Sequence, residues 1–128
     1  MLCILIHYEG LVALSKALDR RGRHQRVKVL YSILSLLLLH VVEIWVFGVT
    51  LWFLLRWPEC GALSAGAPHL FDAVYFSAVT FSTVGYGDMI PVGAIRFLAG
   101  TESLVGLVLI TWSASFTYLE MERFWRRP

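Results

Sequence analysis

Two long apolar runs are separated by a more mixed stretch of chain. The first covers residues 29–57 and reads "VLYSILSLLLLHVVEIWVFGVTLWFLLRW"; the second covers 92–119 and reads "VGAIRFLAGTESLVGLVLITWSASFTYL". Each exceeds the roughly 20 residues that a helix needs to cross a bilayer at about 1.5 Å per residue. Backbone in lipid must satisfy its own hydrogen bonds. The pattern therefore predicts two transmembrane helices, one at 29–57 and one at 92–119.

The connection between these runs divides into three pieces. Residues 58–69, "PECGALSAGAPH", are rich in Gly, Ala and Pro, which predicts an exposed loop, here called the turret. Residues 70–82, "LFDAVYFSAVTFS", are apolar but too short to span, which suits a re-entrant helix whose N-terminus is capped or charged by Asp72. The helix must end at 83–88, "TVGYGD", because two glycines in three residues do not continue a helix.

The first 19 residues form a separate hydrophobic segment. Its polar residues His7, Glu9, Ser15 and Lys16 do not gather on one helical face, as they would in an amphipathic surface helix. Eighteen residues of helix span about 27 Å, just enough to cross a bilayer. We expect a third transmembrane helix at 1–19, with an interfacial helix as the alternative.

Composition and charge favour the same class of protein. The chain is 58% hydrophobic and 16% charged, with a mean hydropathy of +0.69. Six of the 11 Lys and Arg residues precede the first apolar run and three follow the second. By the positive-inside rule, the basic linker 20–28 and the tail 120–128 are cytoplasmic. We expect the linker to touch anionic lipid and not nucleic acid, because basic runs beside membrane spans usually set topology.

Two glycines give residues 83–88 an unusual backbone freedom. Gly85 and Gly87 can take positive φ at no steric cost, in alternation with Val84 and Tyr86. Successive carbonyls would then point one way, and the Thr83 hydroxyl would extend the row. A single row binds a cation poorly, whereas rows repeated around a symmetry axis form rings that replace a hydration shell. The negative C-terminal end of the re-entrant helix favours a cation there.

The run "TVGYG" resembles the selectivity-filter signature of the potassium channel superfamily. Residues 29–119 are similar to its prokaryotic-type pore module in order: outer helix, turret, pore helix, filter, inner helix. The resemblance implies an all-α membrane protein that forms a homotetramer and conducts K⁺ in preference to Na⁺. It places ion binding at the five filter residues, Thr83, Val84, Gly85, Tyr86 and Gly87. It also places Asp88 at the outer mouth of the pore and Pro91 at the turn into the inner helix.

Residues behind the filter depart from the family pattern. The resemblance assigns filter support to four positions: Tyr75, Phe76, Val79 and Ser82. Tyr75 and Phe76 stand where many members carry two tryptophans. The aromatic side chains around Tyr86 are therefore smaller than in those members. Val79 stands where some prokaryotic members hold a glutamate, so Asp88 lacks that carboxylate partner.

The inner helix carries the candidate cavity lining. Its stripe consists of Leu104, Val108, Thr111 and Ser115. On a pore-facing stripe the two hydroxyls would wet the inner vestibule; alternatively they bond to carbonyls of their own helix. Gly106 is a candidate hinge or, alternatively, a close-packing glycine.

Five ionisable residues fall at similar depths if all three segments span. They are His7, Glu9, His40, Glu43 and Glu102. Ionisable groups inside a membrane are costly, so they pair and face other helices. We expect a structural hydrogen-bond cluster; the sharper hypothesis is a proton sensor that responds when His7 or His40 is protonated.

These observations predict a potassium-selective channel in the cell membrane, with passive conduction through a tetrameric pore. A non-conducting regulatory or assembly subunit is the alternative, and a small membrane enzyme is disfavoured because it would not need Gly-Tyr-Gly. We expect no cofactor apart from the transported K⁺ ions. Cys60 lies in the turret and would be either a free thiol or an inter-subunit bridge.

Overall fold

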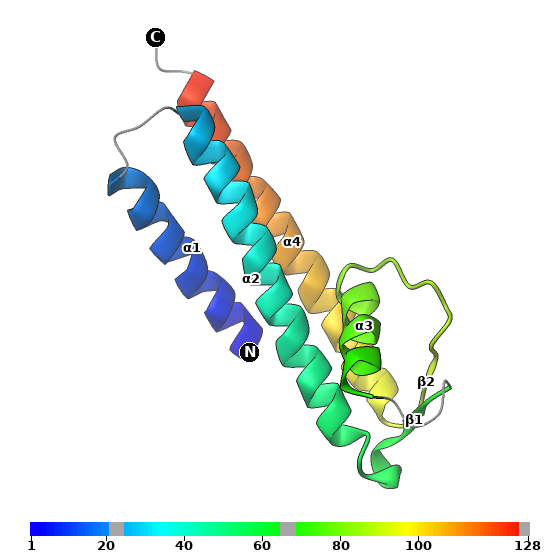
Figure 1. Cartoon of the computed structure of the whole chain (residues 1–128). Helices are drawn as coiled ribbons and strands as arrows, with labels where there is room; N and C mark the ends of the chain where they lie inside the picture. The colour runs from blue at the N-terminus through cyan, green and yellow to red at the C-terminus, as the bar shows by residue number, and fades with distance from the viewer. Residues whose placement is uncertain (21–24, 65–68, 126–128) are drawn as a thin grey trace. The chain divides into compact units, whose positions relative to one another are not determined.

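The computed structural model describes residues 1–20, 25–64 and 69–125, and the chain is helical over most of them (Figure 1). In chain order the elements are α1 (Leu2–Arg20), α2 (Gln25–Leu54), a 3₁₀ turn (Pro58–Cys60), β1 (Ala62–Leu63), α3 (Leu70–Phe81), β2 (Pro91–Val92) and α4 (Ile95–Trp125). They form two compact units. The helical unit is Met1–Glu43 with Leu109–Pro128, and the filter unit is Ile44–Val108.

Two of these helices are long and apolar enough to cross a membrane. They are Arg26–Leu54 and Ile95–Arg123, whose most apolar 18-residue stretches have mean hydropathies of 2.1 and 1.5. The prediction of two transmembrane helices in a two-helix pore module is confirmed to this extent. The segment 1–19 forms α1, but α1 is not among the helices that meet this test. Its crossing of the membrane therefore stays a prediction.

Several element boundaries differ from those expected. The outer helix was placed at 29–57, whereas α2 begins inside the basic linker and ends at Leu54, shortly before the turn at Pro58. The inner helix was placed at 92–119, whereas α4 covers Ile95–Trp125. Its later start has a local cause, because Pro91 and Val92 pair as β2 and Gly93 has a φ of +85°. Parts of the predicted linker (21–24), turret (65–68) and tail (126–128) lie outside the described residues.

In the helical unit, α1 runs beside the N-terminal part of α2 (Figure 1). The buried residues of α1 follow a single stripe spaced by three or four positions, namely Cys3, His7, Leu11, Leu14 and Leu18. Three of these leucines form a core with Leu36 of α2. Polar residues of α1 are scattered, as the sequence indicated, but its buried face is regular. This face packs like the stripe of an amphipathic helix.

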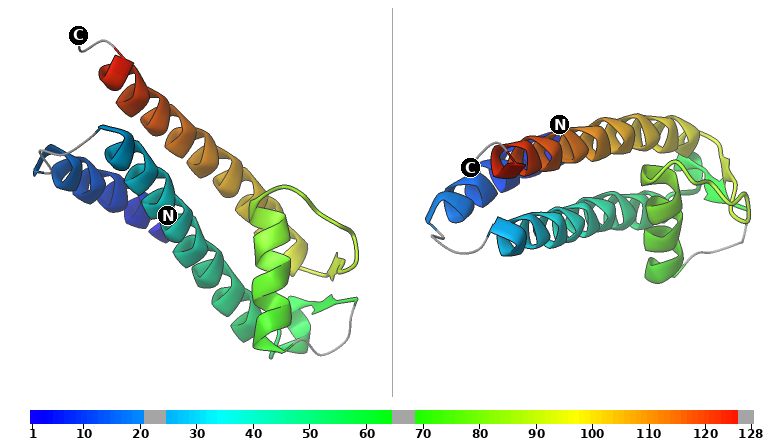
Figure 2. Two further views of the ribbon diagram at one scale, coloured as in Figure 1. Left: turned by 45° about the horizontal axis from the view of Figure 1, so that its top comes forward. Right: turned by 90° about the horizontal axis from the view of Figure 1, so that it is seen from above.

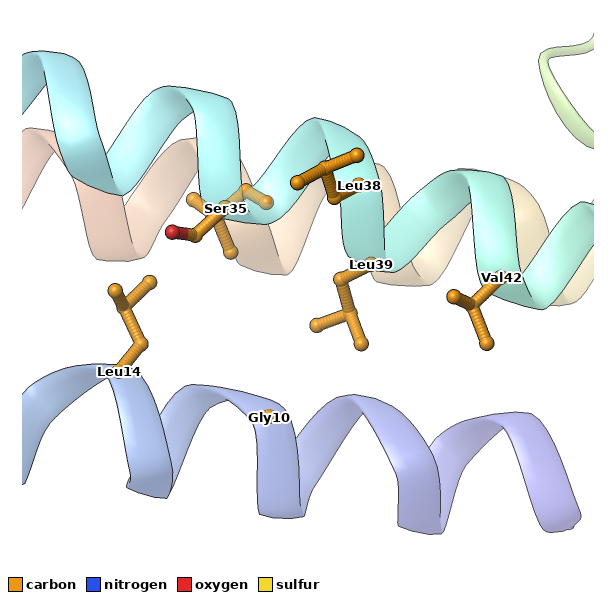
Figure 3. A pocket seen from close by; sticks show the side chains of 7 residues that line it. Gly10, Leu14, Ser35, Leu38, Leu39 and Val42 are labelled. Carbon is orange, nitrogen blue, oxygen red and sulfur yellow. The ribbon is translucent and has the colours of Figure 1, made fainter.

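An open apolar groove of about 250 Å³ lies between α1 and α2 (Figure 3). Its lining consists of Gly10, Leu14, Ser35, Leu36, Leu38, Leu39 and Val42. Ser35 supplies the one hydroxyl in this lining. The groove therefore suits apolar groups and has no donor set for an ion.

The filter unit is organised around the short helix α3 and a two-stranded ribbon (Figure 2). Its core contains Leu51, Leu63, Ala73, Phe76, Ile95 and Ala99. β1 pairs antiparallel with β2, with Ala62 opposite Val92 and Leu63 opposite Pro91. The turret was predicted to be an exposed loop, and this is wrong for Leu63, which is only 2% exposed. Pairing of β1 with β2 places Leu63 in the core. Strands of two residues are too short to be predicted from the sequence.

Two glycines let α3 approach its neighbouring helices closely. A Cβ added at Gly48 of α2 would lie 2.8 Å from the Cα of Val74. A Cβ added at Gly106 of α4 would collide with the backbone carbonyl of Phe81, at the end of α3. Small residues at helix contacts in membranes serve this purpose. The close-packing interpretation of Gly106 is confirmed, while the hinge role stays untested.

We predict opposite effects of alanine at two glycines of α4. Gly106→Ala should lower the melting temperature of the detergent-solubilised protein, because overpacking against backbone costs about 1–3 kcal/mol. Gly100→Ala is the control, since a Cβ there meets nothing within 4 Å. It should be neutral or stabilising by up to about 1 kcal/mol, since alanine favours helix. Circular dichroism during heating measures both. Equal stability of the two variants would contradict the close packing.

Candidate functional site

The pore helix α3 begins at a reciprocal cap. The backbone N–H of His69 donates to Asp72 Oδ2 at 2.8 Å, and the His69 side chain accepts from the backbone N–H of Asp72. The cap satisfies the His69 N–H, while the Asp72 N–H also donates to the His69 carbonyl at 3.1 Å. The prediction that Asp72 caps this helix is confirmed. Its carboxylate also complements the positive end of the helix dipole.

The chain folds back on α3 as soon as the helix ends. Ser82 N–H donates to Ala78 O at 3.1 Å, Thr83 N–H to Thr80 O at 3.0 Å, and Gly85 N–H to Val79 O at 3.0 Å. These bonds satisfy terminal carbonyls that have no partner within a regular helix. The start of segment 83–88, here called the filter, is therefore fixed directly by the C-terminus of α3.

The filter backbone alternates in conformation. Positive φ occurs at every second residue: 61° at Thr83, 52° at Gly85 and 79° at Gly87. The predicted positive φ of both glycines is confirmed. Thr83 was not predicted to take it, because a β-branched residue pays a steric cost there. Its bond to Thr80 at the helix end holds it in place.

The filter is exposed in the single chain. All residues 83–88 are exposed, with Tyr86 at 72% and Val84 at 55%. A Cβ added at Gly85 or Gly87 would meet nothing within 4 Å. The filter thus has a constrained backbone, and no other part of the described chain covers its apolar side chains.

Asp88 at the end of the filter is held by Tyr75 of α3. The Tyr75 hydroxyl donates to Asp88 Oδ2 at 2.8 Å, and Met89 N–H donates to Asp88 Oδ1 at 3.1 Å. The hydrogen bond to this carboxylate raises the pKa of Tyr75 above its usual value. Val79 is buried and apolar, so it offers Asp88 no polar partner. The Tyr75 hydroxyl is the polar partner of Asp88 instead.

The other predicted support residues act differently. Phe76 is 4% exposed and belongs to the core under α3. Ser82 is exposed, and its hydroxyl donates to Ala78 O at 2.7 Å within its own helix. Phe76 therefore supports the filter through packing, and Ser82 through the cap of α3.

Sequence reasoning missed a polar clamp on α3. The Ser77 hydroxyl donates to the Ile44 carbonyl of α2 at 2.9 Å and is hydrogen-bonded to the Glu102 carboxyl of α4. Ser77 and Glu102 are both fully buried, at 0% and 1% exposure. Ser103 adds a bond to the Thr80 carbonyl at 3.2 Å. The sequence did contain a signal for this contact. A serine lies in the largely apolar segment 70–82, and a glutamate lies in the largely apolar first half of the inner helix.

The inner-helix stripe is exposed along its length. Leu104, Val108, Thr111 and Ser115 are all exposed in the single chain. Ser115 donates to the Thr111 carbonyl at 2.9 Å, one turn earlier in α4. The alternative that this hydroxyl bonds to its own helix is confirmed. Lining of a cavity stays a prediction for these four residues.

The helical unit contains a buried polar cluster. His7 Nδ1 lies 2.9 Å from Glu43 Oε1, and His40 Nδ1 lies 2.9 Å from Glu43 Oε2. The prediction of a five-membered cluster is wrong for two members. Glu9 is exposed on α1, and Glu102 belongs to the filter unit, where Ser77 is its partner. Helical spacing turns position 9 away from the face that carries His7. The proton-sensor hypothesis stays untested.

Comparison with known proteins identifies the family. A family model described as "Ion channel" matches residues 27–122, which cover most of α2 and α4 and all of α3 and the filter. The chain belongs to this family of ion channels. Its resemblance to the pore module of the potassium channel superfamily is thereby confirmed.

Individual relatives are similar over shorter stretches. The inward rectifier potassium channel Kirbac3.1 of Paramagnetospirillum magnetotacticum is 36% identical over 74 residues, or 56% of this chain and 25% of that protein. The two-pore potassium channel 4 of Arabidopsis thaliana is 34% identical over 87 residues, or 67% and 27%. Protein LctB of Bacillus caldotenax is 45% identical over 40 residues, or 31% and 30%. The chain thus spans 25–30% of the length of these relatives. No solved structure matches it significantly.

We predict that the α3 clamp depends on a paired carboxyl group. Ser77→Ala should destabilise the protein by about 1–3 kcal/mol, because it leaves buried polar atoms without their partner. Glu102→Gln should cost less, since the amide donates to the Ser77 oxygen while Ser77 donates to Ile44. Thermal unfolding in detergent measures both changes.

Ser32→Ala is the matched control for this comparison. Ser32 is also fully buried, but its hydroxyl donates to the Lys28 carbonyl of its own helix. Removing such a bond should change stability little. If Ser77→Ala were no more harmful than Ser32→Ala, the clamp would contribute nothing.

Proposed function

We propose that the chain is the pore-forming subunit of a potassium-selective channel. The observation that carries the proposal is the alternating positive φ at Thr83, Gly85 and Gly87, within the sequence Thr-Val-Gly-Tyr-Gly. A backbone that reverses its conformation at alternate residues turns successive carbonyls toward one side. Carbonyl oxygens are the groups that replace the hydration shell of K⁺ in channel filters.

A tetramer follows from what one chain lacks. One filter strand supplies one oxygen at each level, whereas a hydration shell is replaced by several. Cyclic symmetry repeats the same strand around an axis, and four copies give rings of four oxygens. The exposure of Val84 and Tyr86 supports this arrangement, because neighbouring subunits would cover them. Phe97 of α4, which is 84% exposed, would likewise face another subunit or lipid.

The electrostatics of the site favour a cation at the inner end of the filter. α3 ends at Phe81, immediately before the filter, and its C-terminus carries a partial negative charge. Asp88 adds a carboxylate at the other end of the filter, held by Tyr75. We propose that these charges help K⁺ enter from both sides. The process is passive conduction and requires no covalent chemistry.

We propose a cell-membrane location with the basic linker and the C-terminus in the cytoplasm. Lys and Arg residues concentrate in the linker 20–28 and near the C-terminus. Cytoplasmic flanks of membrane helices carry this excess. The filter then opens toward the outside, and the linker is placed to contact anionic lipid.

Purified protein in liposomes should conduct K⁺ in preference to Na⁺. With opposed gradients of the two ions, the reversal potential should follow K⁺. Gly85→Ala should abolish the flux: its Cβ meets no atom of the chain, so the effect is on the backbone. A left-handed conformation costs a residue with a Cβ about 1–2 kcal/mol, which rearranges the carbonyl row.

Gly100→Ala serves as the control for a glycine outside the filter and should conduct normally. Equal permeability to Na⁺ and K⁺ would contradict the proposal of selectivity. Absence of flux in a protein with correctly assembled subunits would favour a non-conducting subunit instead.

The assembled protein should contain four chains. Native mass spectrometry in a mild detergent should give about four times 14.5 kDa, the mass of one chain. The physical reason is that one chain provides a single filter strand. A conducting monomer or dimer would rule out the fourfold filter.

A further inference from the structure

The buried cluster of the helical unit has no part in the proposed filter. Its members are His7 of α1, with His40 and Glu43 of α2. From their geometry we infer that they form a binding site for a divalent transition-metal ion, with zinc as the expected occupant. The site joins α1 to α2 and is independent of the proposed conduction.

The donor set is the first argument. Two imidazole nitrogens and one carboxylate are the ligands that zinc and its neighbours in the first transition row take in proteins. The printed sequence offers four histidines, and two of them meet on this one carboxylate. His40 reaches Glu43 from one turn earlier on the same helix, and His7 comes from a different helix. Ionisable side chains in a membrane helix are costly unless they are paired, so their convergence on one carboxylate is consistent with a shared positive partner.

Geometry is the second argument. One donor atom from each of the three side chains lies within 4.8 Å of the other two. Zinc–nitrogen and zinc–oxygen bonds are about 2.0–2.2 Å, so ligand atoms around a tetrahedral ion lie about 3.4 Å apart. Side-chain rotation that draws the three atoms inward completes this arrangement. A water molecule or a further donor would take the fourth position.

The surroundings of His7 provide the third argument. Its ring is fully buried, and Ser113 Oγ of α4 lies 3.4 Å from Nε2. When Nδ1 faces the metal, Nε2–H donates to this hydroxyl and fixes the tautomer and orientation of the ring. Metal-bound histidines generally have such a partner for the second nitrogen. The Trp112 ring, with its centroid 5.4 Å from that of His7, packs against the same side chain.

Charge and access are consistent with a metal ion. Glu43 is fully buried, and an ionised carboxylate away from water needs a positive partner. A divalent cation supplies that charge and replaces the two histidine hydrogen bonds. The His40 side chain keeps 15% of its surface exposed in the single chain, so the cluster is not closed on that side.

Binding to the wild-type protein is the first test. The full-length chain, purified in detergent and stripped with a chelator, is titrated with zinc alone by calorimetry. We expect one zinc per chain. Cobalt in place of zinc should give the visible absorption of a four-coordinate ion with nitrogen and oxygen ligands. No saturable binding of either metal would overturn the inference.

Variants assign the site to its residues. Ser113→Ala should weaken zinc binding about tenfold, because it removes the partner that orients His7. His7→Gln and His40→Gln should weaken it more than Ser113→Ala does. His69→Gln is the matched control, since His69 is exposed at the start of α3 and should leave affinity unchanged. Unchanged affinity in the His7 and His40 variants would overturn the inference.

X-ray absorption at the zinc edge provides a test that needs no variant. The wild-type protein should show nitrogen and oxygen neighbours with the outer-shell scattering of imidazole. Sulfur in the first shell would assign the zinc to Cys3 or Cys60 and would overturn the site. This measurement decides the question even if a histidine variant fails to fold. It is also unaffected by whether the protein conducts.

Discussion

The contact on which the filter unit depends is the close anchoring of α3 between α2 and α4. Gly48 and Gly106 remove side chains from the surfaces that α3 touches, and Ser77 joins α3 to the Ile44 carbonyl and the Glu102 carboxyl. A short helix cannot hold itself in place, because most helical stability comes from packing. Once α3 is fixed, its last carbonyls receive the N–H groups that begin the filter. The filter conformation is thus a consequence of how α3 is held.

The filter contains local backbone strain at Thr83. Thr83 keeps a positive φ that a β-branched residue avoids, and such conformations persist where the surroundings determine them. Its surroundings here are the end of α3 on one side and, through Asp88, the Tyr75 hydroxyl on the other. Tyr75 thereby compensates for the apolar Val79. In this chain the aspartate at the end of the filter is thus held through a phenol.

The helical unit is held together differently, by an apolar interface that contains a buried polar cluster. Leucines of α1 and α2 supply the apolar contact, and one buried carboxylate with two imidazoles interrupts it. Breaking such a buried group would be costly, while its presence adds little net stability. A polar cluster that persists in an apolar interface is therefore a candidate for specificity or binding. The proposed metal site would explain why three polar side chains lie together in this apolar interface.

The sequence alone determined the class of protein, because long apolar runs and the Gly-Tyr-Gly segment depend only on local composition and backbone sterics. The positive φ at Gly85 and Gly87 and the cap by Asp72 follow from the same local rules. Tertiary structure decided what lies close in space but distant in sequence. It paired Glu102 with Ser77, a partner not expected for it, and placed Leu63 in the core through the β1–β2 ribbon. Depth along a helix is readable from sequence, but the direction in which a side chain meets another helix depends on packing.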